Sequence, residues 1–155
     1  MSVSYPYRKI LVPLDFSEDS RRAFDHGSAL AEAAGADLVL LTVIEDSFPY
    51  PELFAWDHPD EEFYRSLRTR ALERMQEFLE GTGEEPRAEK IVVRGHPRGE
   101  IVAVAEDIGA DCIVMARHGS GGIKNALMGS TTEGVLRAAH CPVVVLPAPD
   151  GSARS

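Results

Sequence analysis

The sequence predicts an α/β fold: a doubly wound, three-layer sandwich with helices on both faces of a five-stranded parallel sheet. Short apolar, β-rich runs alternate along the chain with longer segments in which apolar residues recur at helical spacing. The strand-like runs are apolar on both faces, as in a parallel sheet that helices cover on both sides. Each strand–helix–strand unit is then expected to form a right-handed crossover.

The first half of the chain predicts two strands and two helices. Ser17 is suited to cap the first helix and Gly35 to end it. The second helix carries apolar residues on one face, at Phe63, Leu67, Ala71, Met75, Phe78 and Leu79. In chain order the elements are a strand at residues 9–15, a helix at 17–34, a strand at 36–44 and a helix at 60–80.

The second half predicts three further strands and two further helices. Pro97 stands at the first turn of the third helix and Gly109 just past its end, where these residues are favoured. A chain of this length fits one core, so we expect a single domain over residues 1–148 and a disordered tail at 149–155. The predicted elements are strands at 88–94, 110–116 and 142–147 and helices at 97–108 and 130–139.

One connection, residues 45–64, is long for an α/β protein and rich in aromatic side chains. Two interpretations fit it. The segment folds its aromatic residues onto the domain, or it serves as a lid over a ligand or a contact surface for a partner subunit.

The chain is acidic, with a formal net charge of -9 and a pI near 5.0. Nucleic-acid and anionic-membrane surfaces need clustered Lys and Arg, so neither partner is expected. The N-terminal residues contain no apolar segment typical of a secretory signal, and no apolar run is long enough to span a membrane. We therefore expect a cytoplasmic protein. Cys112 and Cys141 are interpreted as small buried apolar residues, with a redox or metal role as the alternative.

The predicted topology places a crevice between two strand ends. In open parallel sheets, ligands bind beyond the carboxyl ends of the strands, where the connections run to opposite faces. The first strand ends at Asp15, and the fourth ends at Ala116, just before a glycine-rich segment. These two unusual stretches therefore meet at the predicted crevice.

The glycine-rich segment predicts a phosphate site. Its glycines leave backbone N–H groups unshielded, and the helix that follows adds its own N-terminal N–H groups and dipole. We place a phosphate between Gly119 and the turn at Gly129 and Ser130. Ser130 and Glu133 have the spacing of a capping box at the start of that helix. The alternative is a merely tight strand-to-helix turn, in which Ser130 serves only as a helix cap. Positive charge nearby comes from Arg117, His118 and Lys124.

Asp15 constrains what else the crevice binds. A carboxylate at this strand end would repel a phosphate and suits a sugar hydroxyl, a base amino group or Mg²⁺. The alternative role is to cap the first helix together with Ser17. The sequence contains no GxxxxGK[ST] P-loop, and the acidic segment after the first strand is unlike the phosphate loop of a flavodoxin-like module.

Four separated segments together resemble the universal stress protein family: KILVPLDFSEDS, the GHP that starts at Gly95, GADCIVMARHG and MGSTTEGVLRAAHCPVVVLP. The resemblance spans residues 7–147 and keeps the order of the segments. It implies a Rossmann-like fold of the adenine nucleotide alpha hydrolase-like type. It also implies binding of ATP, with Mg²⁺, because ATP-binding members carry a G-x2-G-x9-G-[ST] pattern. Here that pattern falls on Ala116, Gly119, Gly129 and Ser130.

By the same resemblance, the site residues surround the base, ribose and phosphates. Alanine at position 116 fits an extended backbone, which we expect at a strand end, whereas a required positive φ would distort the pocket. Leu14 replaces a Thr seen in some members, so a hydroxyl contact to phosphate is lost. The resemblance assigns Pro13, Leu14 and Asp15 to the base and ribose, the backbone of Val43 to adenine, Met115 to packing on the base, and a backbone N–H of Thr131 to a phosphate.

No catalytic set of residues and no metal-ligand cluster is evident from the sequence. His118 alone of the histidines lies in the predicted site, where we interpret it as a phosphate contact or a solvated side chain. The leading hypothesis is a non-catalytic ATP-binding regulatory protein of the stress response, with an unknown protein partner. The alternatives are a slow ATPase or autophosphorylating enzyme, and a nucleotide-free interaction module of the same fold.

A homodimer is expected through the last strand. The run PVVVLP is apolar and is predicted at the sheet edge, and bare edges invite pairing. The resemblance implies that this strand pairs with its copy across a two-fold axis.

Overall fold

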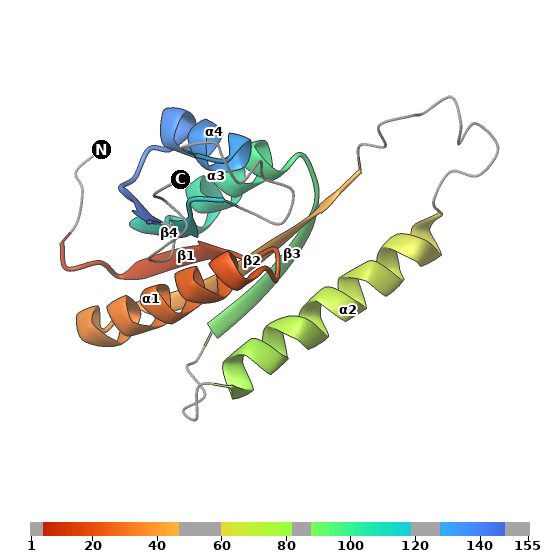
Figure 1. Cartoon of the computed structure of the whole chain (residues 1–155), viewed down its shortest axis with the longest axis horizontal. Coiled ribbons are helices and arrows are strands. Elements are labelled where there is room, and N and C mark those ends of the chain that lie inside the picture. Colours follow the sequence, from red (N-terminus) through yellow and green to blue (C-terminus); the bar gives the residue numbers. More distant parts are fainter. Residues whose placement is uncertain (1–4, 47–59, 82–87, 119–127, 148–155) are drawn as a thin grey trace, which may run out of the picture.

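The sheet has five parallel strands in the order β3-β2-β1-β4-β5 (Figure 1). The computed structural model describes residues 5–46, 60–81, 88–118 and 128–147. Each predicted element is found at its predicted place in the chain. The strands are β1 (Lys9–Pro13), β2 (Asp37–Glu45), β3 (Ala88–Gly95), β4 (Cys112–Ala116) and β5 (Val143–Leu146). The helices are α1 (Glu18–Ala34), α2 (Glu61–Glu80), α3 (Pro97–Ile108) and α4 (Ser130–Ala138).

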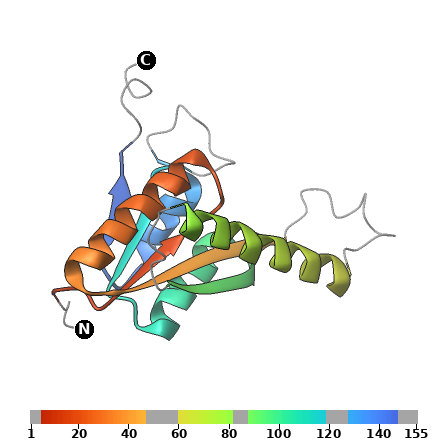
Figure 2. The same cartoon turned by 90° about the horizontal axis from the view of Figure 1, so that it is seen from below.

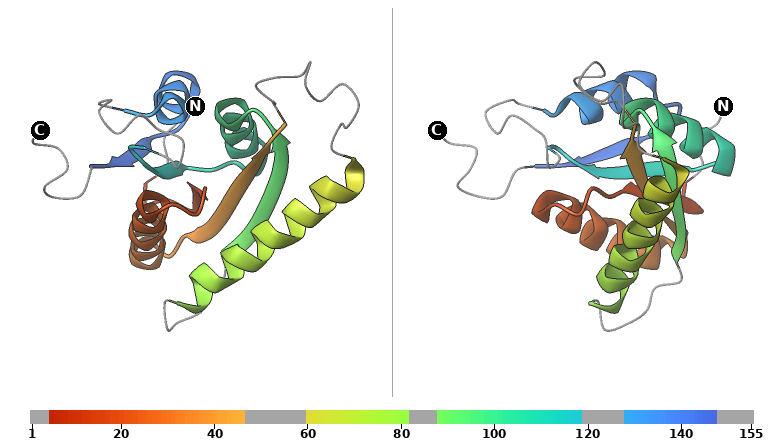
Figure 3. Two further views of the ribbon diagram at one scale, coloured as in Figure 1. Left: turned by 45° about the vertical axis from the view of Figure 1, so that its right-hand side comes forward. Right: turned by 90° about the vertical axis from the view of Figure 1, so that its right-hand side faces the viewer.

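Helices cover both faces of the sheet, which confirms the predicted sandwich (Figures 2 and 3). On one face, α1 packs over β1 and β4, while α2 runs along β2 and β3. On the other face, α3 and α4 lie side by side. The helices that follow the two neighbouring strands β1 and β4, α1 and α4, therefore leave the sheet on opposite sides.

The central strands are buried on both faces. Along β1, Ile10 and Val12 join the core cluster that contains Phe24 of α1. Leu11, between them, joins the cluster that contains Ile101 of α3. All five side chains are almost completely buried. Two cores on either side of one sheet explain why the strands appear in the sequence as continuous apolar runs.

Three helix ends follow the local sequence signals. The Ser17 side chain caps α1 by accepting a hydrogen bond from the Ser20 N–H, as predicted. Gly35 and Gly109 end α1 and α3 in the left-handed conformation, with φ of 65° and 66°. Such backbone angles favour glycine, so these boundaries could be predicted from the sequence.

The first turn of α2 differs from the prediction. Phe63, expected on the apolar face, is 45% exposed, whereas Tyr64 is buried. The Arg94 guanidinium lies 3.5 Å from the centroid of the Tyr64 ring, and it also pairs with Asp46 at 3.6 Å and with Glu61 at 3.4 Å. This cation–π contact with Arg94 of β3 favours the burial of Tyr64 in place of Phe63.

β5 forms one edge of the sheet, as predicted, and three of its four residues are half-buried. Within the described ranges, no helix has both the length and the apolar character needed to cross a membrane. The predicted tail at residues 149–155 and most of the 45–64 connection lie outside the described residues.

Candidate functional site

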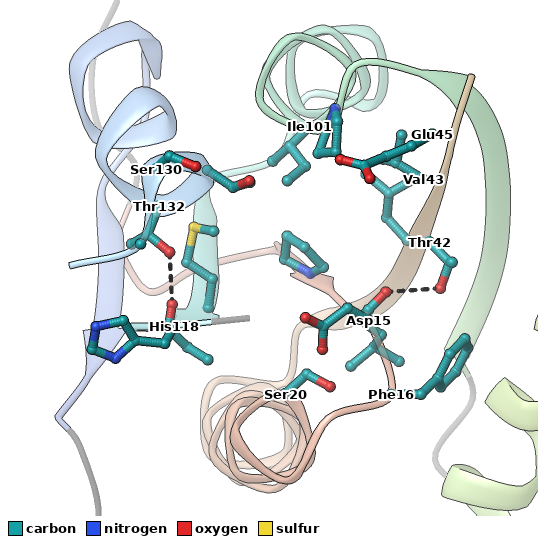
Figure 4. Close-up of a pocket in the computed structure, with 18 residues that line it drawn as sticks. Asp15, Phe16, Ser20, Thr42, Val43, Glu45, Ile101, His118, Ser130 and Thr132 are labelled. Carbon is teal, nitrogen blue, oxygen red and sulfur yellow. Dashed lines mark hydrogen bonds between the residues drawn. The ribbon is translucent and has the colours of Figure 1, made fainter. Parts of the chain in front are cut away.

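A cavity of about 570 Å³ opens at the carboxyl ends of β1, β2 and β4 (Figure 4). It lies at the crevice that the topology predicts, because β1 and β4 are neighbours in the sheet and their following helices lie on opposite faces. Volumes of this order are typical of small-molecule and cofactor sites.

The wall formed by β1 and β2 is held together beyond the last paired residues of the two strands. The Leu14 N–H donates to the Leu41 carbonyl at 2.7 Å. The buried Thr42 hydroxyl then donates to the Leu14 carbonyl at 3.0 Å (Figure 4). Leu14 itself is buried in the core on the α1 side. Leu14 therefore acts as a structural part of the wall.

Asp15 braces the start of α1. Its Oδ1 accepts hydrogen bonds from the Ser17 N–H at 3.0 Å and from the Ser17 hydroxyl at 2.5 Å, while Ser17 caps the helix. The capping role considered for Asp15 is therefore present in the structure. The Asp15 carboxylate also lines the cavity and is exposed, so capping does not withdraw it from the site.

Phe16 adopts an unusual backbone conformation beside Asp15. Its φ of 64° is the only positive value at a non-glycine position in the described part of the chain. The ring packs edge-on against Phe78, with 5.5 Å between centroids, and lies under the Arg74 guanidinium at 4.6 Å. Left-handed backbone at a bulky residue is strained, so these contacts from α2 must hold the turn at the cavity wall.

The opposite wall is built by β4 and α4. Ala116 is the last residue of β4 and pairs with Leu146, so its backbone is extended, as expected. The Thr132 hydroxyl donates to the Ala116 carbonyl at 2.8 Å, and the Gly129 N–H donates to the Arg117 carbonyl at 2.8 Å. These bonds join the first turn of α4 directly to the end of β4.

The predicted capping box of α4 is wrong. Gly129 occupies the N-cap position, and no side chain of the described residues makes a capping hydrogen bond there. Ser130 is the first helical residue, one position too late to cap, and Glu133 instead pairs with Arg137 at 2.7 Å. The Gly129 backbone is extended, with φ of -68° and ψ of 154°, so the helix begins one residue later than a Ser130 cap requires. The α4 N-terminus therefore faces the cavity without a side-chain cap.

The backbone of Val43 faces the cavity. Leu41 presents its carbonyl to β1, and residues two apart on a strand point their backbone groups to the same side. The pairing of β1 with β2 ends at Pro13 and Leu41, so the N–H and C=O of Val43 lie beyond β1. The site thus offers one donor and one acceptor side by side at this wall.

The structure brings nearly all the predicted site residues together. Gly119 lies outside the described residues. The others all line the cavity: Pro13, Leu14, Asp15, Val43, Met115, Ala116, Gly129, Ser130 and Thr131. His118 also lines it.

Sequence reasoning missed several lining residues. Glu45, Pro97 and Ile101 stand at the ends of β2 and β3 or at the start of α3, and parallel topology brings these points to the same edge of the sheet. The parallel topology could therefore have predicted that these three residues lie near the cavity. Thr42 and Thr132 were signalled only weakly, as hydroxyl groups within otherwise apolar surroundings.

The cysteines are structural. Cys112 is fully buried, and burial raises the pKa of its thiol to about 11. Burial also raises the pKa of the half-buried Cys141. A high thiol pKa disfavours the reactive thiolate. The interpretation as a small buried apolar residue holds for Cys112, whereas Cys141 is only half-buried. In the residues that the structure describes, no group of three or more His, Cys, Asp or Glu could hold a metal ion.

A parallel α/β sheet with a cofactor-sized cavity at its switch point defines a protein of Rossmann-like architecture. The model of the universal stress protein family matches residues 6–147. The chain belongs to this family.

Named relatives match it over nearly their whole length. Universal stress protein MJ0577 of Methanocaldococcus jannaschii is 32% identical, with 93% of this chain and 97% of that protein covered. The structure of this chain matches the solved structure of MJ0577 with a TM-score of 0.77 and 34% sequence identity. The match covers 94% of this chain and 99% of that chain. The structure of universal stress protein UspA from Lactobacillus plantarum matches with a TM-score of 0.78 and 26% identity, and the match covers 90% of this chain and 97% of that chain.

A further structure of this fold is a universal stress protein in complex with cAMP. It has a TM-score of 0.66 and 24% identity, and the match covers 92% of this chain and 99% of that one.

Proposed function

We propose that this protein is a non-catalytic, ATP-binding regulatory protein of the stress response, cytoplasmic and homodimeric. The single observation that carries the proposal is the cavity at the switch point, whose two ends differ in chemistry. A protein of the same fold that binds cAMP supports an adenine nucleotide as the ligand class.

One end of the cavity suits a purine base. Pro13, Ile101 and Met115 supply apolar surface on which a flat ring can stack. The N–H and C=O of Val43 lie side by side at the same wall, in the donor and acceptor order that adenine needs at N1 and at its amino group.

The other end suits phosphate. The N-terminus of α4 offers the backbone N–H groups of Ser130 and Thr131 and the positive end of a helix dipole, while the Gly129 N–H is bonded to Arg117. His118 lies at this end as a further polar contact (Figure 4). We propose that the phosphates lie here and that Asp15, at the opposite wall, meets the ribose or a Mg²⁺ ion that accompanies ATP.

Nucleotide content and binding heat test the proposal. The purified protein is denatured, and the supernatant is separated by chromatography. Protein stripped of nucleotide is then titrated with ATP, with and without Mg²⁺, by calorimetry. Intact ATP and a one-site binding isotherm are expected. Recovery of ADP alone would favour the slow ATPase, and the absence of both nucleotide and binding heat would leave an interaction module.

The proposed homodimer forms through β5, which is apolar and lies at the sheet edge. Pairing of this strand with its copy would remove an exposed edge. Sedimentation at micromolar concentration is expected to give the mass of a dimer, and Val144→Lys is expected to shift it toward the monomer. A monomeric wild-type protein would overturn this part of the proposal.

A further inference from the structure

We infer that Glu45 selects the base of the nucleotide, by accepting a hydrogen bond from the exocyclic amino group of adenine. The inference rests on the proposed function, since it assigns a residue within the same cavity. Glu45 is the last residue of β2 and lines the cavity together with Pro97 and Ile101. In Figure 4 its carboxylate points inward, beside Val43 and Ile101.

The geometry of β2 places Glu45 next to the proposed base contact. Side chains two residues apart on a strand share one face of the sheet, so Glu45 and Val43 point to the same side. Val43 packs in the core cluster that contains Ile101, on the α3 side. A ring held by the Val43 backbone therefore presents its polar edge toward the Glu45 carboxylate.

The hydrogen-bond inventory of adenine fits these groups. Its N1 accepts from the Val43 N–H, and one hydrogen of the amino group is donated to the Val43 C=O. The second amino hydrogen is left over, and a carboxylate can only accept. Hypoxanthine and guanine carry a carbonyl oxygen at the same ring position, which Glu45 would repel in addition to the Val43 C=O.

Two neighbouring carboxylates, those of Asp46 and Asp15, are already engaged. Asp46 pairs with Arg94 at 3.6 Å, and Asp15 accepts two hydrogen bonds from Ser17. Within the described ranges, the Glu45 carboxylate forms neither a hydrogen bond nor an ion pair, although it faces the cavity. Of the two acidic residues that line the cavity, Asp15 and Glu45, Glu45 is therefore the one whose carboxylate no partner among the described residues engages.

The experiment compares ATP with ITP, which differ in the amino and keto groups at this ring position. Calorimetry gives the ratio of the two affinities for wild-type protein, Glu45→Gln and Glu45→Ala. Glutamine can donate to the keto oxygen, so Glu45→Gln is expected to lower the preference for ATP about tenfold, with tighter ITP binding. Glu45→Ala is expected to weaken ATP binding about tenfold without tightening ITP.

The matched control is Asp46→Asn, which removes the same charge one residue away, outside the cavity lining. It should leave the ratio of affinities unchanged. If wild-type protein binds ATP and Glu45→Gln keeps the wild-type ratio, the role of Glu45 is overturned and the proposed function stands. If wild-type protein binds neither nucleotide, both are overturned.

Discussion

The N-termini of α1 and α4 both meet the cavity, but they are built in opposite ways. α1 starts behind a side-chain cap: Ser17 accepts from the Ser20 N–H, and Asp15 braces Ser17. Two acidic residues follow in its first turn. α4 starts at Gly129 with no side-chain cap, and its first turn is anchored by Thr132 to the end of β4.

Because of this difference, the two helix starts offer opposite electrostatic environments to a ligand in the cavity. A capped helix start with carboxylates nearby repels anions, whereas an uncapped start held in place from behind attracts them. The side-chain hydroxyl of Thr132 holds α4 to the Ala116 carbonyl at the end of β4. This bond uses none of the backbone N–H groups at the start of α4. In the proposed complex, the phosphates would therefore lie at α4 and the base at β1 and β2.

The largest effect on ATP affinity is expected from a bulky side chain at Gly129, the residue before α4. Gly129→Val adds a branched side chain where the proposed phosphate must approach backbone N–H groups. Its φ of -68° is open to valine, so the fold should survive. We expect ATP affinity to fall about 100-fold, equivalent to about 2.7 kcal/mol.

Calorimetry checks this loss, with Gly99→Val as the control. Gly99 lies in the first turn of α3, and nothing within 4 Å would meet a side chain there. Retained affinity in Gly129→Val would show that the phosphates lie elsewhere.

The anchor behind α4 should matter for stability. Thr132→Val keeps the shape of a buried side chain but leaves the Ala116 carbonyl without its donor. The expected loss is about 1–3 kcal/mol in the free energy of unfolding. Urea denaturation measures it, with Thr131→Val as the matched neighbour. Equal stability of the two variants would contradict the anchoring role.

The smallest expected effect is on the free energy of unfolding, and it compares the starts of α1 and α4 directly. Ser17→Ala removes a side-chain cap and is expected to lower the free energy of unfolding by about 1 kcal/mol. Ser130→Ala removes no cap and should change it by less than about 0.5 kcal/mol. Thermal denaturation of both variants makes the comparison, and a larger loss in Ser130→Ala would restore the capping box.

The fold was predictable because its signals are local. Apolar runs, helical spacing and glycines such as Gly35 and Gly109 act within a few residues, and all the elements were found where they predict. The region of the site was predictable too, since parallel topology places the ends of β1 and β4 together. Glu45 was missed, because its part in the cavity depends on where β2 ends relative to α3.

The α/β class, the order of the elements and the crevice between Asp15 and Ala116 follow from the pattern of residues along the chain. Three other features depend on packing between distant segments: which helix start is capped, which residue of α2 is buried, and which side chains face the cavity. Spacing reports which groups share a helix or a strand, whereas the partners of Thr132, Tyr64 and Glu45 come from elements distant in the chain.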